Sequence, residues 1–267
     1  MRTRLLVSCA LLALTGCPKK GGEDAATLLP QVRQRLAERD TKLTSYRIAG
    51  TVKDEGQEAV RFTFDYRAPQ RMLGTLGPPA SRSFAWDGTH LYQRLDGDKQ
   101  FTTFKSELPP AKLAEFLTGT FSPFTPEGFR TPLLSRAATA RRATHPRAPE
   151  AVELVQKLEG EGAGVEMVYV LRWPRLDFLG RRTRSPDGTE AEERVEEEHC
   201  DEALGLCVPK RLTRWLGGRR VGETVLGRVE LNAPLPNDAF TLTAPEGYAV
   251  QSRTLVESAP ATPPTGG

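Results

Sequence analysis

The fold is decided by the stretch Val60-Arg61-Phe62-Thr63-Phe64-Asp65-Tyr66-Arg67. Apolar and aromatic residues alternate in it with polar and charged ones. In a β-strand, successive side chains point to opposite faces, so this stretch makes one aromatic face and one charged face. A helix would scatter the same rings around its circumference. The stretch therefore predicts a strand whose aromatic face is covered by other parts of the chain.

The same alternation continues on both sides of this strand. Tyr46, Ile48 and Val52 repeat it upstream, and Phe84 and Trp86 repeat it downstream. Turn residues separate the runs, and Asp-Gly at 87–88 is the strongest of these hairpin signals. We therefore expect an antiparallel meander with strands at 46–53, 58–67, 71–76, 82–86, 91–95 and 100–104.

Two helices are expected to cover the apolar face of the meander. In the first, leucine and valine recur at helical spacing between residues 24 and 43, and we place the charged residues on the opposite side. The apolar positions are Leu28, Leu29, Val32, Leu36 and Leu43, and the charged ones are Arg33, Arg35, Glu38 and Arg39. A second, short helix follows Pro109-Pro110 and is expected to end at Gly119. Residues 120–149 have no clean period and are interpreted as an irregular lid or crossover.

A second meander is predicted after residue 150. Its strands are expected at 152–158, 166–173, 175–184, 189–198, 207–216, 223–231 and 240–242. We find no internal repeat and no change of composition class, so residues 25–257 are interpreted as one domain. The tail 258–267 is rich in Pro, Thr and Gly and is expected to be disordered.

The first 24 residues predict a lipid anchor. Arg2 and Arg4 precede a short apolar run, which ends in Leu14-Thr15-Gly16-Cys17 and resembles the bacterial lipobox. Residues 1–16 are therefore interpreted as a signal peptide that is too short to span a bilayer in the mature protein. Cys17 is expected to carry the lipid, and residues 17–24 would form a flexible tether. The alternatives are an ordinary signal peptide with a chance cysteine and the start of a buried helix.

Composition and charge exclude several classes of protein. The chain has 267 residues, of which 38% are hydrophobic, and this argues against a protein with many membrane spans. The formal net charge is +3, and removal of Arg2 and Arg4 would leave 3 − 2 = +1. This near-neutral balance gives no reason to expect a nucleic-acid partner.

Catalysis finds no support in the motifs. His90, His145 and His199 lack a motif partner, and the sequence contains neither H-E-x-x-H nor G-x-S-x-G. We therefore expect a non-enzymatic protein without a cofactor or a metal.

The cysteines predict one disulfide. Cys9 would leave with the signal peptide and Cys17 would carry lipid, so Cys200 and Cys207 remain as a pair in an oxidising compartment. A bond between them would join two strands across a hairpin tip. Two alternatives are a metal site that includes His199 and a redox-active pair, although the spacing differs from C-x-x-C.

Two local motifs, in the right order of elements, carry a family resemblance. Asp87-Gly88-Thr89-His90-Leu91-Tyr92 is similar to the D-G-x-x-L-aromatic motif of the LolA/LolB superfamily of periplasmic lipoprotein carriers and receptors. The stretch 240–247, FTLTAPEG, is similar to the closing F-x-F/L-x-x-P-x-G strand of that superfamily. The resemblance covers most of residues 25–250 as an order of elements.

The resemblance implies an unclosed, curved antiparallel β-barrel with helices as a lid over its concave apolar face, and acyl chains bound between them. The ligand-binding residues expected from this arrangement are Ile48, Val52, Phe62, Phe64, Phe84 and Trp86 in the trough, with Phe116, Leu117 and Phe121 from the lid. Ordinary core packing is the alternative for each. In LolA proteins an arginine immediately before a proline helps to hold the lid. Here the order is Arg67-Ala68-Pro69, one place off, and we do not assign that role to Arg67.

Two functions follow from these residues and motifs. The first is a lipoprotein, closer to LolB because of Cys17, that binds lipid acyl chains or lipoproteins and has a periplasmic carrier protein as a possible partner. Pro18 follows Cys17 in place of a retention-signal aspartate, which favours the outer membrane of a Gram-negative bacterium, facing the periplasm. The second is a structural or envelope-stress-sensing lipoprotein with a filled core and no bound lipid. A dry apolar cavity under residues 109–121 would favour the first function, and a packed interior with a polar groove would favour the second.

Overall fold

The computed structural model describes residues 25–129, 139–158 and 163–256. The predicted signal peptide, Cys17, the tether and the tail lie outside these residues. Within them, no helix combines the length and the apolar character that a membrane crossing requires.

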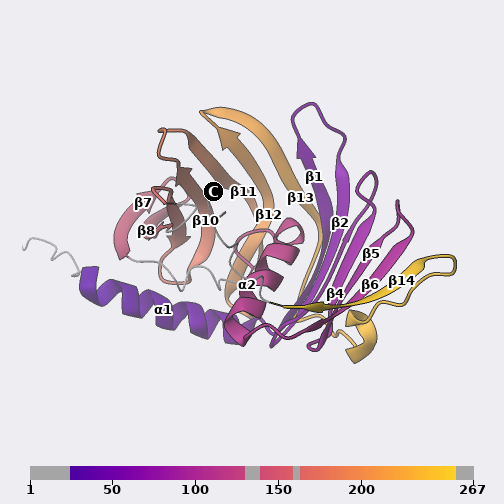
Figure 1. Ribbon diagram of the computed structural model, residues 1–267. Helices are drawn as coiled ribbons and strands as arrows, with labels where there is room; N and C mark the ends of the chain where they lie inside the picture. Colours follow the sequence, from indigo (N-terminus) through magenta and orange to yellow (C-terminus); the bar gives the residue numbers. More distant parts are fainter. Residues whose placement is uncertain (1–24, 130–138, 159–162, 257–267) are drawn as a thin grey trace, which may run out of the picture.

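The described strands form one 14-stranded sheet that curls around the helix α2 (Figure 1). The first meander contains β1 (Ser45–Asp54), β2 (Val60–Arg67), β3 (Arg71–Leu76), β4 (Arg82–Trp86), β5 (His90–Leu95) and β6 (Gln100–Ser106). The later strands are β7 (Thr139–His145), β8 (Ala148–Lys157), β9 (Glu166–Arg172), β10 (Asp177–Arg184), β11 (Glu190–Asp201), β12 (Leu206–Leu216), β13 (Arg219–Leu231) and β14 (Ala249–Leu255). The order runs β14-β6-β5-β4-β3-β2-β1-β13-β12-β11-β10-β9-β8-β7, with β14 and β7 at the two edges. The predicted fold class, an unclosed curved barrel, is confirmed.

The register of the first hairpin follows the alternation in the sequence. Tyr46 pairs with Tyr66, and Ile48 pairs with Phe64 across β1 and β2. Side chains of directly paired residues lie on the same face of a sheet, so the aromatic residues of both strands gather on one side. The two meanders are joined where β1 pairs antiparallel with β13.

Each helix covers a different half of the sheet. α1 (Ala25–Lys42) packs Leu28, Val32 and Leu36 into a buried cluster with side chains of β7–β12. α2 (Pro110–Phe121) and the 3-10 turn η1 (Ser122–Phe124) pack into a second cluster with side chains of β1–β6, β12 and β13. The core is therefore divided into two parts, each with its own helix.

The boundaries of α2 and of the crossover differ from the prediction. α2 continues past Gly119 to Phe121, because Gly119 keeps a helical conformation. Residues 139–145 form β7, and β8 begins at Ala148, so the last part of the predicted irregular segment, from residue 139 on, belongs to a hairpin. Charged residues of β7 hid its alternation: the exposed Arg141 pairs with Glu153 of β8 at 2.6 Å.

The prediction of a last strand at 240–242 is wrong. Phe240 ends the 3-10 turn η4 (Asn237–Phe240) and is buried with Ala233 and Leu235. The last strand is β14, which pairs in parallel with β6. β14 buries almost none of its side chains, so its sequence carries no apolar alternation from which a strand could be predicted.

Candidate functional site

The candidate site is the aromatic face of β1–β6 together with the segment that covers it. We call residues 110–129, which comprise α2, η1 and the five residues after them, the lid segment. Its Leu117, Phe121 and Phe124 are at most 1% exposed. The ring of Phe121 lies 6.1 Å from that of Phe64, and the ring of Phe124 lies 6.0 Å from that of Phe84. The lid segment therefore fills the concave face in this closed arrangement.

A glycine of β3 brings the lid segment into direct contact with the sheet backbone. A Cβ atom at Gly74 would lie 2.6 Å from Cγ of Phe124, well inside van der Waals contact. The absence of a side chain thus creates the depression in which the Phe124 ring lies. Glycine within a strand often marks such a close approach.

Arg39 of α1 holds the far end of the lid segment. Its guanidinium group donates hydrogen bonds to the carbonyl oxygens of Phe129 at 3.0 Å and Gly128 at 2.7 Å, and to that of Cys207 at 3.4 Å. Burial lowers the pKa of Arg39, and Asp177 and other neighbouring groups oppose this shift. Hydrogen bonds that involve a charged donor are stronger than neutral ones. Arg39 thus connects α1, the lid segment and β12.

Most of the predicted ligand-binding residues lie together in the cluster beneath the lid segment. The fully buried members are Ile48, Phe62, Phe64, Trp86, Leu117 and Phe121, while Val52 and Phe84 are partly buried against them. Phe116 differs, because it is 38% exposed. Leu113, Leu117 and Phe121 are spaced four residues apart and form the covered stripe of α2, so Phe116 lies outside that stripe. The structure thus places Phe116 on the exposed side of α2, and its contact with a ligand stays a prediction.

Several residues that shape the site were not predicted from the sequence. Arg39 was assigned to the polar side of its helix, yet positions 36, 39 and 43 are separated by three and four residues and share the apolar stripe. That spacing was the signal that could have identified Arg39 as buried. Phe129 was not given a role, and it packs on Tyr46 with ring centroids 5.0 Å apart. Arg67 instead binds the carbonyl oxygen of Leu235 at 2.6 Å, outside the lid segment.

A polar cavity of about 320 Å³ lies beside the lid segment. Arg181 of β10 pairs there with Glu127 of the lid segment at 2.6 Å and with Glu193 of β11 at 3.7 Å. Burial raises the pKa of Glu127 and of Glu193, and the charge of Arg181 opposes both shifts. The cavity is lined by Val52, Ser122, Pro123, Phe124, Thr125, Pro126, Glu127, Arg181, Glu193, Arg214 and Thr224. Its mixed, charged lining differs from the dry apolar cavity that would favour a bound acyl chain.

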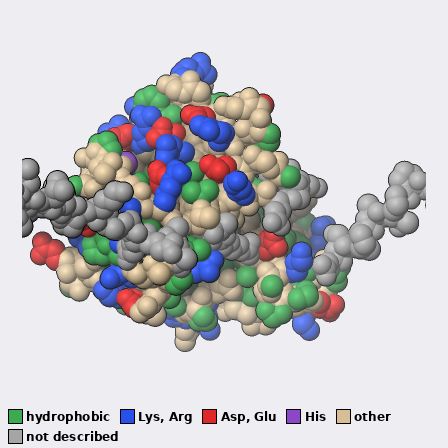
Figure 2. Space-filling view, turned by 90° about the vertical axis from the view of Figure 1, so that its left-hand side faces the viewer, with side chains coloured by type: hydrophobic (Ala, Val, Ile, Leu, Met, Phe, Trp, Pro, Cys, Tyr) green, Lys and Arg blue, Asp and Glu red, His purple; other side chains and the backbone are tan. Residues whose placement is uncertain are grey.

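The outer face of the second meander carries paired charges. Arg182 follows Arg181 in β10 and points to the opposite face of the sheet. It binds Glu153 at 2.5 Å, and Arg141 binds the same carboxylate. Figure 2 shows basic and acidic side chains interleaved on this side of the molecule. A second cavity, of about 430 Å³, lies among these pairs.

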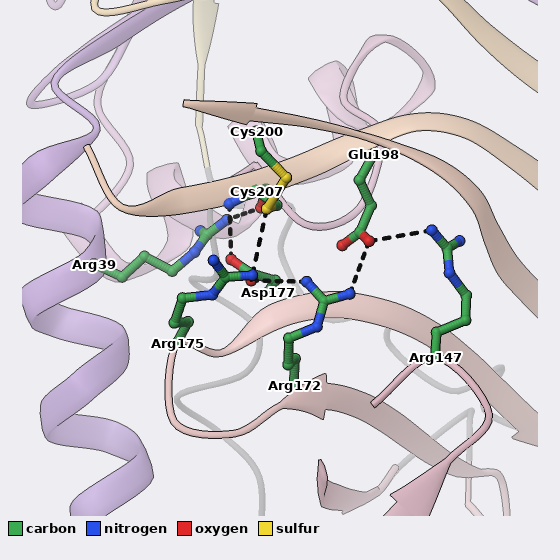
Figure 3. The surroundings of a disulfide bond; sticks show 8 residues. All are labelled: Arg39, Arg147, Arg172, Arg175, Asp177, Glu198, Cys200 and Cys207. Carbon is green, nitrogen blue, oxygen red and sulfur yellow. Dashed lines mark hydrogen bonds and ion pairs between the residues drawn. A yellow bond between two sulfur atoms is a disulfide. The ribbon is translucent and has the colours of Figure 1, made fainter. Parts of the chain in front are cut away.

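The predicted disulfide between Cys200 and Cys207 is confirmed, across the paired ends of β11 and β12. Beneath it lies a network of ion pairs (Figure 3). Asp177 pairs with Arg172 at 3.1 Å and with Arg175 at 2.8 Å, and Arg172 also binds Glu198 at 2.8 Å. Asp177 is completely buried and accepts the backbone N–H of Cys207 at 2.8 Å.

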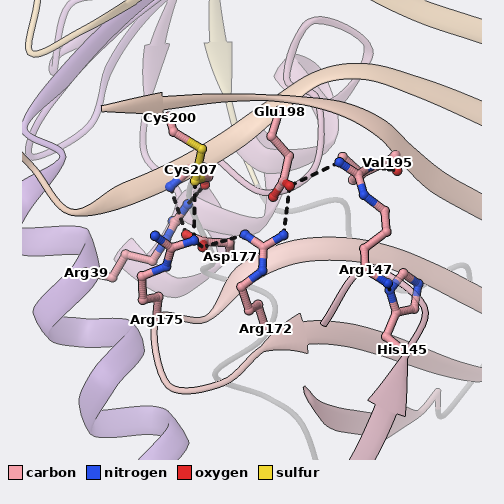
Figure 4. A network of polar contacts seen from close by, with 10 residues as sticks. All are labelled: Arg39, His145, Arg147, Arg172, Arg175, Asp177, Val195, Glu198, Cys200 and Cys207. Carbon is pink, nitrogen blue, oxygen red and sulfur yellow. Dashed lines mark hydrogen bonds and ion pairs between the residues drawn. A yellow bond between two sulfur atoms is a disulfide. The ribbon is translucent and has the colours of Figure 1, made fainter. Parts of the chain in front are cut away.

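The β7–β8 turn completes this network (Figure 4). Arg147 binds Glu198 at 3.1 Å and donates a hydrogen bond to the carbonyl oxygen of Val195. Burial, together with the charges of Arg147 and Arg172, lowers the pKa of His145. The network therefore ties the turn to β11.

The network does not fit a metal ion. Oxygen atoms of Asp177 and Glu198 and the sulfur of Cys207 lie within 4.8 Å of one another. The sulfur, however, belongs to the disulfide, and Arg172 bridges the two carboxylates. The alternative metal site with His199, Cys200 and Cys207 is likewise wrong, because a metal-binding cysteine must be a free thiolate.

The Asp-Gly motif that carried part of the resemblance forms the β4–β5 turn. Asp87 accepts the N–H groups of Thr89 and His90, both at 2.7 Å, and the hydroxyl of Tyr92 at 2.8 Å. Burial alone would raise the pKa of Asp87, but these hydrogen bonds lower it overall. His90 lies 3.8 Å from the same carboxylate. The spacing of the motif thus has a structural explanation in this turn.

Comparisons with known proteins identify the fold. The sequence matches no protein-family model and no curated protein. A DUF1329 family protein from Desulfovibrio piger aligns with a TM-score of 0.54 at 9% identity, over 80% of this chain and 97% of its own. A putative outer membrane lipoprotein-sorting protein domain from Vibrio parahaemolyticus aligns with a TM-score of 0.52 at 8% identity. The alignment covers 79% of this chain and 97% of that domain. A LolA superfamily protein from Nitrosomonas europaea aligns at 12% identity, over 79% and 97%, but its TM-score of 0.47 is too low to support an argument.

These likenesses establish the architecture. The alignments cover nearly the whole of the neighbouring chains, so the full half-barrel with its helices is shared. The unclosed, curved barrel that the sequence predicted is therefore an architecture that solved proteins share. A shared fold does not fix a function, which has to be argued from the site.

Proposed function

We propose that this protein is a lipid-anchored periplasmic lipoprotein that binds acyl chains of lipids or lipoproteins on its concave face. It does so without catalysis, as a carrier or receptor in the delivery of lipids or lipoproteins to the outer membrane. Cys17 would carry the anchor, and a periplasmic carrier would be the partner that delivers or collects the cargo.

The observation that carries this proposal is the contact between an aromatic sheet face and a separate covering segment. Leu117, Phe121 and Phe124 lie on β1–β6 through apolar contacts and a shared depression at Gly74. Apolar contact is non-directional, so an acyl chain can replace these side chains without matching their shapes. Opening of the lid segment would expose the trough.

The energies of the two occupants are comparable. Burial of an acyl chain is worth about 0.8 kcal/mol per CH₂, on the order of 10 kcal/mol for a long chain before the costs of association. Each large apolar side chain that leaves the sheet loses about 1.5–3 kcal/mol of burial. Displacement of three such side chains therefore offsets much of the gain, and a reversible exchange results. Reversibility is what a carrier or receptor requires.

The experiment compares uptake by open and cross-linked forms of the lid segment. The chain carries Cys17→Ser so that it stays unlipidated, and it is incubated with palmitate and examined by native mass spectrometry. A double variant, Gly74→Cys with Phe124→Cys, places two thiols within reach of a disulfide at the observed contact. We expect palmitate to bind the uncross-linked chain and to bind the cross-linked chain at least tenfold more weakly.

Three controls make this experiment specific. Each single cysteine variant tests the effect of its own substitution, which removes the ring at Phe124→Cys and adds a side chain against that ring at Gly74→Cys. Neither variant can form the cross-link, and both should retain uptake. Phe116→Asp adds a charge on the exposed side of α2 and should also retain it. Equal uptake by the cross-linked and uncross-linked chains, or no uptake by any form, would contradict the proposal.

A structural or stress-sensing lipoprotein without bound lipid is the second candidate. The filled concave face and the charged cavity beside Arg181 favour it. In that case the lid segment would be a permanent part of the core, and all forms in the uptake experiment would give the mass of the protein alone.

A further inference from the structure

We propose that the Cys200–Cys207 disulfide is a thiol-exchange site, at which a dithiol reductant attacks Cys200 and Cys207 leaves as a thiolate beside Arg175. This assignment is independent of lipid binding. The features that favour exchange come from different strands and are brought together only by the fold, so the spacing of the two cysteines gives no sign of them.

The two cysteines differ in their access to solvent. Cys200 lies in an exposed position at the end of β11, whereas Cys207 is 1% exposed. Thiol–disulfide exchange requires a thiolate to reach one of the two sulfur atoms, so access decides which sulfur is attacked. Because Cys200 is the exposed residue of the pair, we assign the attack to its sulfur, and Cys207 then becomes the leaving group.

The surroundings of Cys207 suit a leaving thiolate. The guanidinium group of Arg175 lies 3.5 Å from its sulfur. The surroundings of the disulfide contain four guanidinium groups and two carboxylates, an excess of 4 − 2 = 2 positive charges. These groups belong to Arg39, Arg147, Arg172, Arg175, Asp177 and Glu198. A thiolate at Cys207 would neutralise part of this excess. A neighbouring cation stabilises a thiolate, and a more stable thiolate leaves faster.

The hairpin does not depend on the disulfide for its geometry. β11 and β12 pair from Ala191–Leu216 to Cys200–Cys207, and the N–H of Cys207 is held by Asp177. The two cysteines are 7 residues apart, and a short loop restrains the unfolded chain less than a long one. Reduction would therefore leave Cys207 in place beside Arg175, ready to form the bond again.

The chemical step balances without any further reactant. A thiolate of the reductant forms a bond with the sulfur of Cys200, the Cys200–Cys207 bond breaks, and its electron pair leaves with Cys207. The second thiol of the reductant then loses its proton and attacks the reductant's own sulfur in the mixed disulfide, which releases the thiolate of Cys200. The reductant is oxidised to a disulfide, and two electrons reach the protein.

The first test locates the attack. Free thiols of the full chain are alkylated, the folded protein reacts briefly with reduced glutathione, and acid stops the exchange. Cleavage after Glu202 separates the two cysteines for mass spectrometry. We expect glutathione on Cys200. Glutathione on Cys207, or equally on both, would overturn the proposal.

The second test measures the role of Arg175 as a positioning residue. Reduction of the folded chain by dithiothreitol at pH 7 is timed for the original chain, Arg175→Gln and Arg175→Lys. We expect Arg175→Gln to slow reduction about threefold to tenfold, because the thiolate loses its neighbouring charge, and Arg175→Lys to restore most of the rate. Arg184→Gln, which removes a charge from an exposed pair with Glu190, is the matched control and should react at the original rate.

A purely structural role for Arg175 predicts the opposite change in the rate of reduction. If Arg175 only stabilised the hairpin, Arg175→Gln would speed reduction by exposing the disulfide. An unchanged or faster rate in Arg175→Gln would therefore count against the proposal, as would a reduction rate that equals the rate of global unfolding measured in urea.

Discussion

At the scale of single residues, Asp87 and Tyr92 form a coupled pair in the β4–β5 turn. Burial, the hydrogen bond to Asp87 and the charge of Asp87 raise the pKa of Tyr92 to about 12, from an ordinary value of 10.0. A phenol whose pKa is higher in the folded protein stabilises the fold below the ordinary value, and this contribution is lost as the pH rises through the folded value. We expect Asp87→Asn to lower the pKa of Tyr92 toward 10, as measured by absorbance at 295 nm.

Tyr92→Phe identifies the titration that belongs to this residue, because the corresponding absorbance change should disappear. Circular dichroism at each pH shows whether the chain is still folded. An unchanged pKa of Tyr92 in Asp87→Asn would mean that burial alone accounts for the shift.

The sequence predicted the apolar residues of the site better than the polar ones. Ile48, Phe64 and Trp86 were found because a period of two assigns them to one face. Arg39 was missed because an arginine is normally exposed, although its helical spacing from Leu36 and Leu43 indicated burial. Its hydrogen-bond partners, the carbonyl groups of residues 128 and 129, could not be predicted from a local pattern.

At the scale of elements, replacing glycine by alanine is expected to change the stability of the fold in opposite directions at two positions. Gly74 lies in β3 beneath the lid segment, and Gly119 lies within that segment. Gly74→Ala would place a methyl group inside the ring of Phe124 and is expected to destabilise the fold by about 1–3 kcal/mol. Gly119→Ala lies in α2 with nothing within 4 Å of the new methyl group, and is expected to stabilise it by about 0.5–1 kcal/mol. Urea unfolding of both variants measures these free energies. The same sign for both would contradict the proposed close contact between the lid segment and β3.

Strands that bury a face were predictable, and strands at the sheet edges were not. β2 was located to the residue at its C-terminal end, because its pattern reflects burial. β7 and β14 lie at the two edges and have few buried side chains, so their conformation is set by pairing with one neighbouring strand. Sequence periodicity reports burial and does not report pairing.

At the scale of the whole molecule, the two partly buried glutamates beside Arg181 make stability depend on pH. Burial raises the pKa of Glu127 and Glu193 above the ordinary value of 4.5. The folded protein then holds protons that the unfolded chain has released, so the contribution of these groups to stability falls as the pH rises above 4.5. We expect the free energy of unfolding of the original chain, minus that of Glu193→Gln, to decrease from pH 4 to pH 7.

Asp187→Asn provides a control, because the contribution of Asp187 to the free energy of unfolding changes with pH in the opposite direction. Backbone and side-chain hydrogen bonds from Thr189 lower the pKa of Asp187, so the contribution of this residue is present above the ordinary value and is lost as the pH falls. A difference for Glu193→Gln that stays constant or rises with pH would contradict the assignment of partly buried, destabilised carboxylates.

The fold class could be predicted from the order of the elements, whereas the division of the core could not. Two meanders and two helices pointed to a half-barrel with a lid. The structure packs α1 on β7–β12 and α2 on β1–β6, β12 and β13, so β12 contributes to both parts of the core. This division depends on how the chain crosses between the two halves. Sequence periodicity does not predict where the chain crosses between the two halves.

The pairing of β1 with β13 has a consequence for the order in which the chain can fold. β1 is complete at residue 54, but its partner is complete only at residue 231. While the chain is synthesised from its N-terminus, the side of β1 that pairs with β13 therefore stays unpaired until residues 219–231 are available. Contacts between residues so far apart in sequence slow folding, and an unpaired edge invites association with other chains. The incomplete chain is thus most prone to association through this edge before residues 219–231 are available to pair with it.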